Sequence, residues 1–540
     1  MSALAVCAVH LICTGFWCVV LASTLWTHHL PTTDLGALAK VLALQTTPRI
    51  WDVRSDVTVK VVLFLSIFYV YYLVRRRHKA ARFSTWSAIL ALFAALLTSV
   101  LLPVDVFIVS YMKDSSGNFK EWAANATSRA DIEDTVLWAY YVLYGLVLIF
   151  VFLFLPFSYF FSEDEDDEVD NEVGWQSRAC TALKYTAGFV FLAVMLFGIG
   201  AVIPMQKPPP NGTEIDKIEF IIEELKSNRG EDALGFVLAV LGLIGMVVII
   251  IYMGSGIATF PMRLICGSES SKNPTGGSTR NERAARTATK IPCLILGGGW
   301  RLVEIVAGIA GFLLGAVFWI SLLLANTDKI QHSLGYKTGY LLPNHTLPNP
   351  LDMLFVYAQS VFPLDYVMFV ILVLFLVLCT IYSIQRIGVW FFWLKVARVR
   401  AGRTHARGLL FLCLSLIYAM IAIHPLLFAV APRYFTYGSE HFLQTNGNKT
   451  HGEAVAVRCS AESSLPDECI MTRASVLLMR FFYKAWIFGA AYYWATWIFL
   501  LVTPAAAITF AVRDCGRSHS DDEDSLEDEL EDNDERMLRV

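Results

Sequence analysis

The chain has 540 residues, of which 56% are hydrophobic and 17% are charged, and its formal net charge is -4. With a mean hydropathy of +0.53, it is too apolar and too weakly charged for a soluble globular protein of this length. No polar block is large enough to fold alone, so we predict one all-α polytopic membrane protein.

Nine apolar runs are long enough to cross a bilayer as helices, because a span needs about 20 mostly apolar residues. They show no strand-like alternation. In chain order they are Val57–Val74, Ser84–Met112, Thr135–Phe161, Thr181–Met205, Ala233–Met262, Leu302–Ala325, Leu364–Ile384, Leu409–Ala431 and Phe481–Phe510. Residues 57–512 therefore form the predicted transmembrane domain.

The N-terminal residues 1–26 form a further apolar run, with small residues near its end but no basic region before it. We interpret it as a signal peptide or as a tenth transmembrane helix. Both interpretations place residues 27–56 in the lumen.

Basic residues and glycosylation sequons predict the orientation. Lys and Arg gather in the loops at 75–82, 263–301 and 386–407, and such short basic loops are retained in the cytosol. The alternate loops hold the four N-x-S/T sequons, which are predicted glycosylation sites in the lumen. These are Asn125, Asn211, Asn344 and Asn448.

Cys459 and Cys469 are the cysteines of a predicted lumenal loop, where an oxidising compartment favours a disulfide over two free thiols.

Two cytosolic segments are predicted to lack a fold. Residues 263–301 are rich in Gly, Ser, Thr and Asn and are interpreted as a flexible linker. Residues 513–540 are strongly acidic and are predicted to be a disordered tail, with partner binding as the alternative.

No catalytic motif and no metal-binding motif is present, so an enzyme is not predicted. The candidate polar site lies instead in the spans, where ionisable groups are costly. Pro103-Val104-Asp105 and Pro363-Leu364-Asp365 share a Pro-x-Asp pattern at similar depth on antiparallel helices. The two carboxylates are therefore expected to face one cavity, unless each lies in the headgroup region with its proline marking a kink.

His424, followed by Pro425, lies within the eighth predicted span. A buried histidine there could sense pH or bind a metal. The alternative is a packing residue that hydrogen-bonds to a carbonyl freed by the proline.

Several long strings resemble the lipocalin-receptor-like (limb region) membrane protein family. They include LLPVDVFIVSYMKDSSGNFKEWAANATSRADIEDTVLWAYYVLY at Leu101–Tyr144, IGVWFFWLKVARVRAGRT from Ile387 and APRYFTYGSEHFL from Ala431. The likeness runs from about Val57 to the acidic tail. The family usually begins near Val57, and its large cytosolic loop is longer than 263–301 here.

The resemblance implies a multi-pass lysosomal membrane protein with a lumenal N-terminus and a cytosolic C-terminus. It implies a role in moving cobalamin from the lysosome to the cytosol, with cobalamin as cargo and no covalently bound cofactor. The family picture includes an ABC transporter of subfamily D as partner, for which such a protein acts as escort and stabiliser. A direct cobalamin transporter and an endocytic receptor are the alternatives.

Overall fold

The computed structural model describes residues 66–70, 82–114, 116–120, 123–166, 175–202, 231–266, 280–336, 339–340, 342, 347–358, 364–391, 394–397, 399, 404, 406–445, 454–459, 469–478 and 486–513. Eight helices in this part of the chain are long and apolar enough to cross a membrane. They are Phe83–Met112, Ala126–Ser162, Gln176–Ala201, Ala233–Cys266, Arg301–His332, Leu364–Ile387, Arg407–Val430 and Trp486–Val512.

These eight spans confirm the predicted all-α polytopic class. Each coincides with one of the eight apolar runs that follow Val57–Val74 in the sequence. Of that first run, residues 66–70 are described and are helical. Residues 1–56 lie outside the described residues, as does the acidic tail beyond Arg513.

Most spans coincide with a single helix, but two are assembled from several segments. The elements are α4 (Arg82–Met112), α5 (Ala126–Ile149), η2 (Phe150–Phe154), α6 (Leu155–Asp166), α7 (Trp175–Val202), α9 (Glu231–Val248), η3 (Ile249–Met253), α10 (Gly254–Cys266), α11 (Arg280–His332), α12 (Pro350–Ala358), α13 (Leu364–Ile387), α14 (Ala406–Val430), α15 (Pro432–Tyr437), α16 (Arg473–Leu478) and α17 (Trp486–Arg513). The segments η2 and η3 are single π-helical turns, so α5 continues through η2 into α6, and α9 through η3 into α10. Such turns widen a helix locally without ending it.

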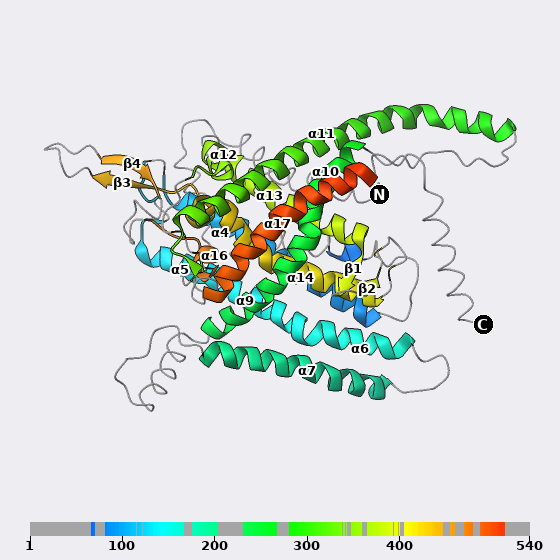
Figure 1. Cartoon of the computed structure of the whole chain (residues 1–540), viewed down its shortest axis with the longest axis horizontal. Coiled ribbons are helices and arrows are strands. Elements are labelled where there is room, and N and C mark those ends of the chain that lie inside the picture. The colour runs from blue at the N-terminus through cyan, green and yellow to red at the C-terminus, as the bar shows by residue number, and fades with distance from the viewer. Residues whose placement is uncertain are drawn as a thin grey trace.

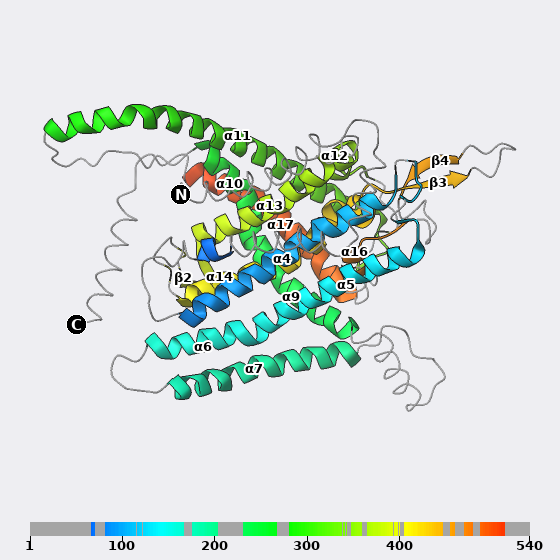
Figure 2. The ribbon, with the colours of Figure 1, turned by 180° about the vertical axis from the view of Figure 1, so that it is seen from behind.

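Two antiparallel hairpins lie toward opposite ends of the bundle (Figure 1, Figure 2). One is β1 (Val389–Phe391) with β2 (Leu394–Ala397), and the other is β3 (His441–Thr445) with β4 (Ala454–Arg458). We call the end that carries β3 and β4 the disulfide end, because Cys459 directly follows β4.

The predicted linker at 263–301 differs from the structure. Helix α10 continues to Cys266 and α11 begins at Arg280, so the second half of the segment is helical and continuous with the following span. Residues 284–288 contain three alanines, and alanine has the highest helix propensity. The Gly- and Ser-rich composition of the first half obscured this signal.

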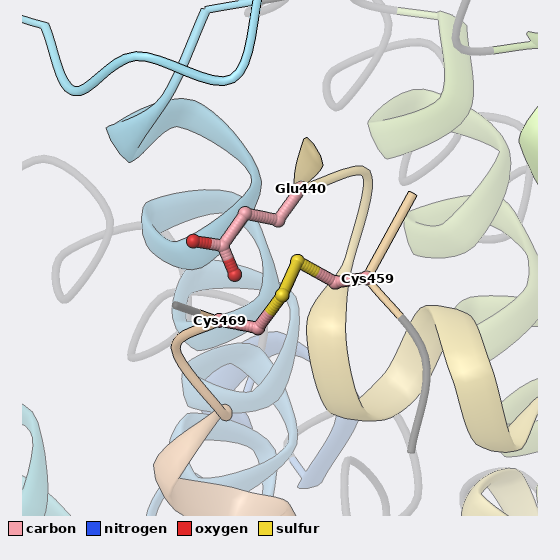
Figure 3. A group of neighbouring side chains, drawn as sticks. All are labelled: Glu440, Cys459 and Cys469. Atoms are coloured by element: carbon pink, nitrogen blue, oxygen red, sulfur yellow. A yellow bond between two sulfur atoms is a disulfide. The ribbon is translucent and has the colours of Figure 1, made fainter. Parts of the chain in front are cut away.

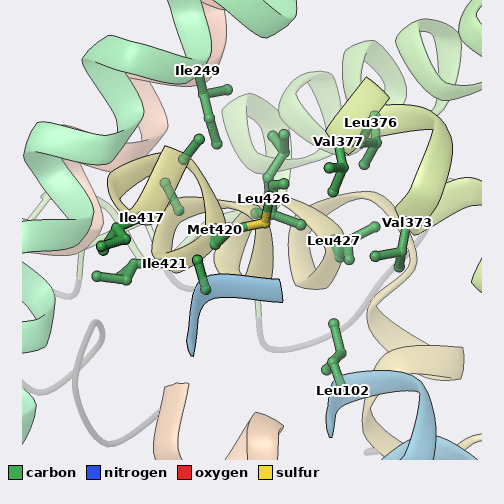
Figure 4. Packing of buried hydrophobic residues seen from close by; sticks show 14 of the residues in the cluster. Leu102, Ile249, Val373, Leu376, Val377, Ile417, Met420, Ile421, Leu426 and Leu427 are labelled. Atoms are coloured by element: carbon green, nitrogen blue, oxygen red, sulfur yellow. The ribbon is translucent and has the colours of Figure 1, made fainter. Parts of the chain in front are cut away.

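Helix α14 is the most buried of the described spans and α7 the least. Figure 4 shows how side chains of η3, α13 and α4 surround α14 in the core. Gly245 of α9 lies so close to α14 that a methyl group at this position would clash with the Tyr418 carbonyl oxygen. Close crossings of this kind require a residue without a side chain.

Candidate functional site

Two helices of six residues each, α15 and α16, lie next to each other at the disulfide end. Thr472, directly before α16, joins them. Its amide donates to the Thr436 carbonyl at 2.8 Å, and its hydroxyl donates to the Phe435 carbonyl at 2.8 Å. Helices this short are not stable alone, so contacts from the surrounding spans have to hold both in place.

Asp105 on α4 holds the beginning of α16. The first amides of a helix have no partner within the helix, and Asp105 accepts from the amides of Ala474 at 2.7 Å and Arg473 at 3.3 Å. Tyr140 on α5 donates its hydroxyl to the same carboxylate at 3.3 Å. The Arg473 guanidinium pairs with Glu133 on α5. The Asp105 carboxylate, which is only 2% exposed, therefore fastens α16 to α4 and α5.

Asp352 on α12 holds the beginning of α15 in the same way. It accepts from the amides of Arg433 at 3.4 Å and Tyr434 at 3.2 Å, which belong to the first turn of α15. Burial raises the pKa of the Asp352 carboxyl to about 6, although these two amides and the charge of Arg433 act in the opposite direction. A carboxyl, buried at Asp105 and half-buried at Asp352, thus caps each of the two short helices.

Asp365, in the first turn of α13, is the third carboxylate of this region. It accepts from the Tyr434 hydroxyl at 3.2 Å, and the Tyr434 ring stacks on Phe355 of α12 with 4.5 Å between the ring centroids. Burial and, after it, the charge of Asp365 raise the pKa of the Tyr434 phenol far above its usual value. Tyr434 therefore stays protonated and links Asp352 to Asp365.

The structure brings Asp105 and Asp365 into one hydrogen-bonded network, which runs from Asp365 through Tyr434 and α15 to Thr472, and through α16 to Asp105. Pro103 lies inside α4, two residues before Asp105, whereas Pro363 lies outside the described residues. Neither carboxylate lines either of two small cavities in the described part of the bundle, one beside His424 and one beside Lys329. The shared cavity stays a prediction.

His424 is buried on α14, with 3% of its surface exposed. Its Nδ1 lies 3.0 Å from the Met420 carbonyl oxygen, one helical turn earlier, while Nε2 is buried with no hydrogen-bond partner. The ring meets Tyr144 of α5 edge-on, with 6.3 Å between the centroids. The predicted roles in pH sensing or metal binding stay predictions.

The structure contains the predicted disulfide between Cys459 and Cys469, with 5.9 Å between the two Cα atoms. Glu440 lies beside it (Figure 3), and its carboxylate and both sulfur atoms fall within 4.8 Å of one another. This is not a suitable metal site, because the sulfurs are bonded to each other rather than present as thiolates. Glu440 instead pairs with Lys113 at 2.9 Å and accepts from the Ile470 amide at 2.8 Å.

Of the four predicted glycosylation sites, Asn125 is described and exposed at the beginning of α5. Its Oδ1 accepts from the Thr127 amide at 3.1 Å. Asn211, Asn344 and Asn448 lie outside the described residues. Glycosylation stays a prediction at all four positions.

Sequence reasoning missed Asp352, although the signal was present. Pro350-Leu351-Asp352 is a third Pro-x-Asp unit, but it lies between the predicted spans, where carboxylates are ordinary. It also missed Tyr434 and the buried pair of Lys113 with Glu440. Nothing in the sequence pairs these residues, because each contact joins positions far apart in the chain.

A model of LMBR1-like membrane proteins matches residues 57–295. A probable lysosomal cobalamin transporter of Nematostella vectensis is 38% identical, with 90% of this chain and 98% of the relative covered. The chain belongs to the LMBR1-like membrane protein family. The lysosomal cobalamin transport escort proteins LMBD1 of Bos taurus and Homo sapiens are each 36% identical, over 81% and 83% of this chain and 89% and 90% of theirs. These relatives are named as transport proteins rather than enzymes, and no solved structure matches the chain.

Proposed function

We propose that this chain is a lysosomal membrane protein that serves the export of cobalamin to the cytosol by escorting and stabilising a transporter. The names of its relatives, which it matches over most of its length, support lysosomal cobalamin transport. The proposal goes further than these names: the chain stabilises a transporter and does not itself form the path that cobalamin takes through the membrane.

The observation that carries this choice is that the three aspartates of this region hydrogen-bond to the protein itself. Asp105 and Asp352 accept from the first amides of α16 and α15, and Asp365 accepts from Tyr434. Carboxylates that bind cargo or ions in transporters face an open cavity. Here they hold short helices in place, and each of the two cavities nearby has a volume of ≈ 20 Å³, enough for about one water molecule.

We propose that the disulfide end faces the lumen and that the C-terminus is cytosolic. An oxidising compartment suits the bond between Cys459 and Cys469, and the exposed Asn125 lies at the same end of the bundle. The described ends of spans opposite to it carry Arg263, Arg301 and Arg386, as cytosolic flanks do. A mobility shift that glycosidase removes in the wild type, and that is reduced in Asn125→Gln, would support this orientation.

The partner in this proposal is an ABC transporter of subfamily D, to which cobalamin passage is assigned. The match to relatives named as escort proteins supports a transporter partner, and the narrower identity rests on the family resemblance. The partner is expected to lose stability or delivery to the lysosome when this chain is removed.

Reconstitution in liposomes with labelled cobalamin tests the proposal. The chain alone is expected to give no uptake above empty liposomes, whereas the ABC transporter with this chain is expected to give uptake and to co-purify with it. Asp134→Ala, at an exposed position of α5, serves as the matched control for folding and insertion. Uptake by this chain alone would overturn the escort and favour the direct transporter.

A further inference from the structure

The cavity beside His424 lies among α5, α9, α14 and α16. Tyr144, Leu238 and Ile421 line it, together with Ala474, Leu477 and Leu478 of α16 and with His424 and Pro425 themselves. Most of this lining is apolar. An apolar cavity of this size would stay dry, so its polar groups decide what it holds.

His424 presents an unsatisfied acceptor to this cavity. Nδ1 is within hydrogen-bond distance of the Met420 carbonyl, which requires a hydrogen on Nδ1 and leaves Nε2 of the neutral ring with a lone pair. That Nε2 is buried and unpartnered. A buried acceptor without a partner destabilises the folded state, so its position next to a cavity calls for an occupant that donates a hydrogen bond.

Two further polar groups belong to the same lining. Pro425 has no amide hydrogen, so the Ile421 carbonyl lacks the donor that an α-helix would otherwise provide four residues later. Tyr144 has a hydroxyl that can donate. A buried water typically makes about three hydrogen bonds, and His424, Ile421 and Tyr144 offer two acceptors and one donor.

We propose that this cavity is a binding site for one water molecule, which donates to His424 Nε2 and to the lone pair of the Ile421 carbonyl that the His424 ring leaves free, and accepts from the Tyr144 hydroxyl. The cavity volume of ≈ 20 Å³ exceeds the roughly 10–15 Å³ that one water requires. Tyr144 meets the ring edge-on, and Leu238 of α9 and Leu477 of α16 line the cavity beside it. Ala474 both lines the cavity and donates its amide to Asp105, so the water adjoins the network that holds α16.

X-ray radiolytic footprinting of the full chain in detergent tests this site, because radicals formed from a bound water oxidise the side chains that touch it. Leu477 lines the cavity and is 4% exposed, whereas Leu376 lies in the core of α13 and is 0% exposed. Leu477 is expected to be oxidised several-fold faster than Leu376. Equal rates in the wild-type protein would overturn the proposal without any variant.

Two variants separate a water held by His424 from solvent that enters for other reasons. His424→Gln keeps a side-chain acceptor, so fast oxidation of Leu477 is expected to persist. His424→Leu removes the acceptor and should lower the rate at Leu477 to that of Leu376. Fast oxidation that persists in His424→Leu would overturn the assignment of the water to His424.

Discussion

Replacing Asp105 by alanine would leave three buried donors without their acceptor. The amides of Ala474 and Arg473 and the hydroxyl of Tyr140 all donate to this carboxylate, with donor–acceptor distances of 2.7, 3.3 and 3.3 Å. An unsatisfied buried donor costs about 1–3 kcal/mol. The loss in the free energy of unfolding should therefore be about 3–9 kcal/mol for the three donors together, and it should lie toward the lower end if water enters the space left by the carboxylate.

Asp105→Asn should be less harmful, since its carbonyl oxygen still accepts from the Ala474 amide. The same oxygen still accepts from the Tyr140 hydroxyl, but the new amide group faces the Arg473 amide, which is itself a donor, so a loss of about 1–3 kcal/mol remains. Tyr140→Phe gives the sharper test. It should cost about 1 kcal/mol in the wild-type background, yet it should be neutral or stabilising in Asp105→Ala, where it removes an unsatisfied hydroxyl.

The measurement is the apparent melting temperature of the full chain in detergent, with Asp134→Ala as the control. Asp134 is exposed on α5, and substitutions at such positions usually change stability by about 0.5 kcal/mol or less. Asp105 does not hold α16 as described if Asp105→Ala and Asp134→Ala have the same melting temperature. The same conclusion follows if Tyr140→Phe lowers the melting temperature equally in the wild type and in Asp105→Ala.

Three further results are expected from groups outside the spans. The pKa of Asp352 is raised from 3.8 to about 6, so the folded protein binds this proton more tightly than the unfolded chain does. The contribution of Asp352 to the free energy of unfolding therefore falls as pH rises from about 4 through 6, by at most about 3 kcal/mol. The melting temperature of Asp352→Asn relative to wild type should therefore rise over this range, and a constant difference would refute this. Lys113→Met should cost about 3–5 kcal/mol because it strands a buried Glu440 charge, and adding Glu440→Gln should restore most of that loss. Cys459→Ser should cost about 3 kcal/mol, matched by Cys469→Ser and by reduction of the wild type.

The spans could be predicted because their signal is local. Composition over about 20 residues decides whether a segment enters the bilayer, and the eight described spans begin and end near the predicted apolar runs. The predicted boundaries are wrong where a helix continues beyond the apolar run into a polar segment. Helix α11 reaches back to Arg280 through a polar segment, and α5 begins at Ala126, nine residues before the predicted start of its apolar run at Thr135.

The candidate site could be predicted only in part. The rule that ionisable groups inside spans are costly led to Asp105 and Asp365. The rule could not indicate that Asp105 accepts hydrogen bonds from the beginning of α16, because Asp105 and Ala474 are 369 positions apart in the sequence. Asp352 was missed because the rule about costly ionisable groups does not apply outside a span, although Asp352 has the same Pro-x-Asp pattern as Asp105 and Asp365.

The three Pro-x-Asp units suggest a common physical reason for the pattern. Proline favours the first turn of a helix, and an acidic residue two positions later would ordinarily lie near the positive end of its own helix dipole. Asp352 and Asp365 do lie in the first turns of α12 and α13. Asp352 nevertheless points its carboxylate at the amides of α15, and Asp105, which follows a proline inside α4, does the same for α16. A buried carboxylate can replace the missing helical acceptors of a neighbour only if a rigid element presents it, and each of these aspartates stands on such an element. The pattern therefore marks where the carboxylate of one helix caps a shorter neighbouring helix at the disulfide end.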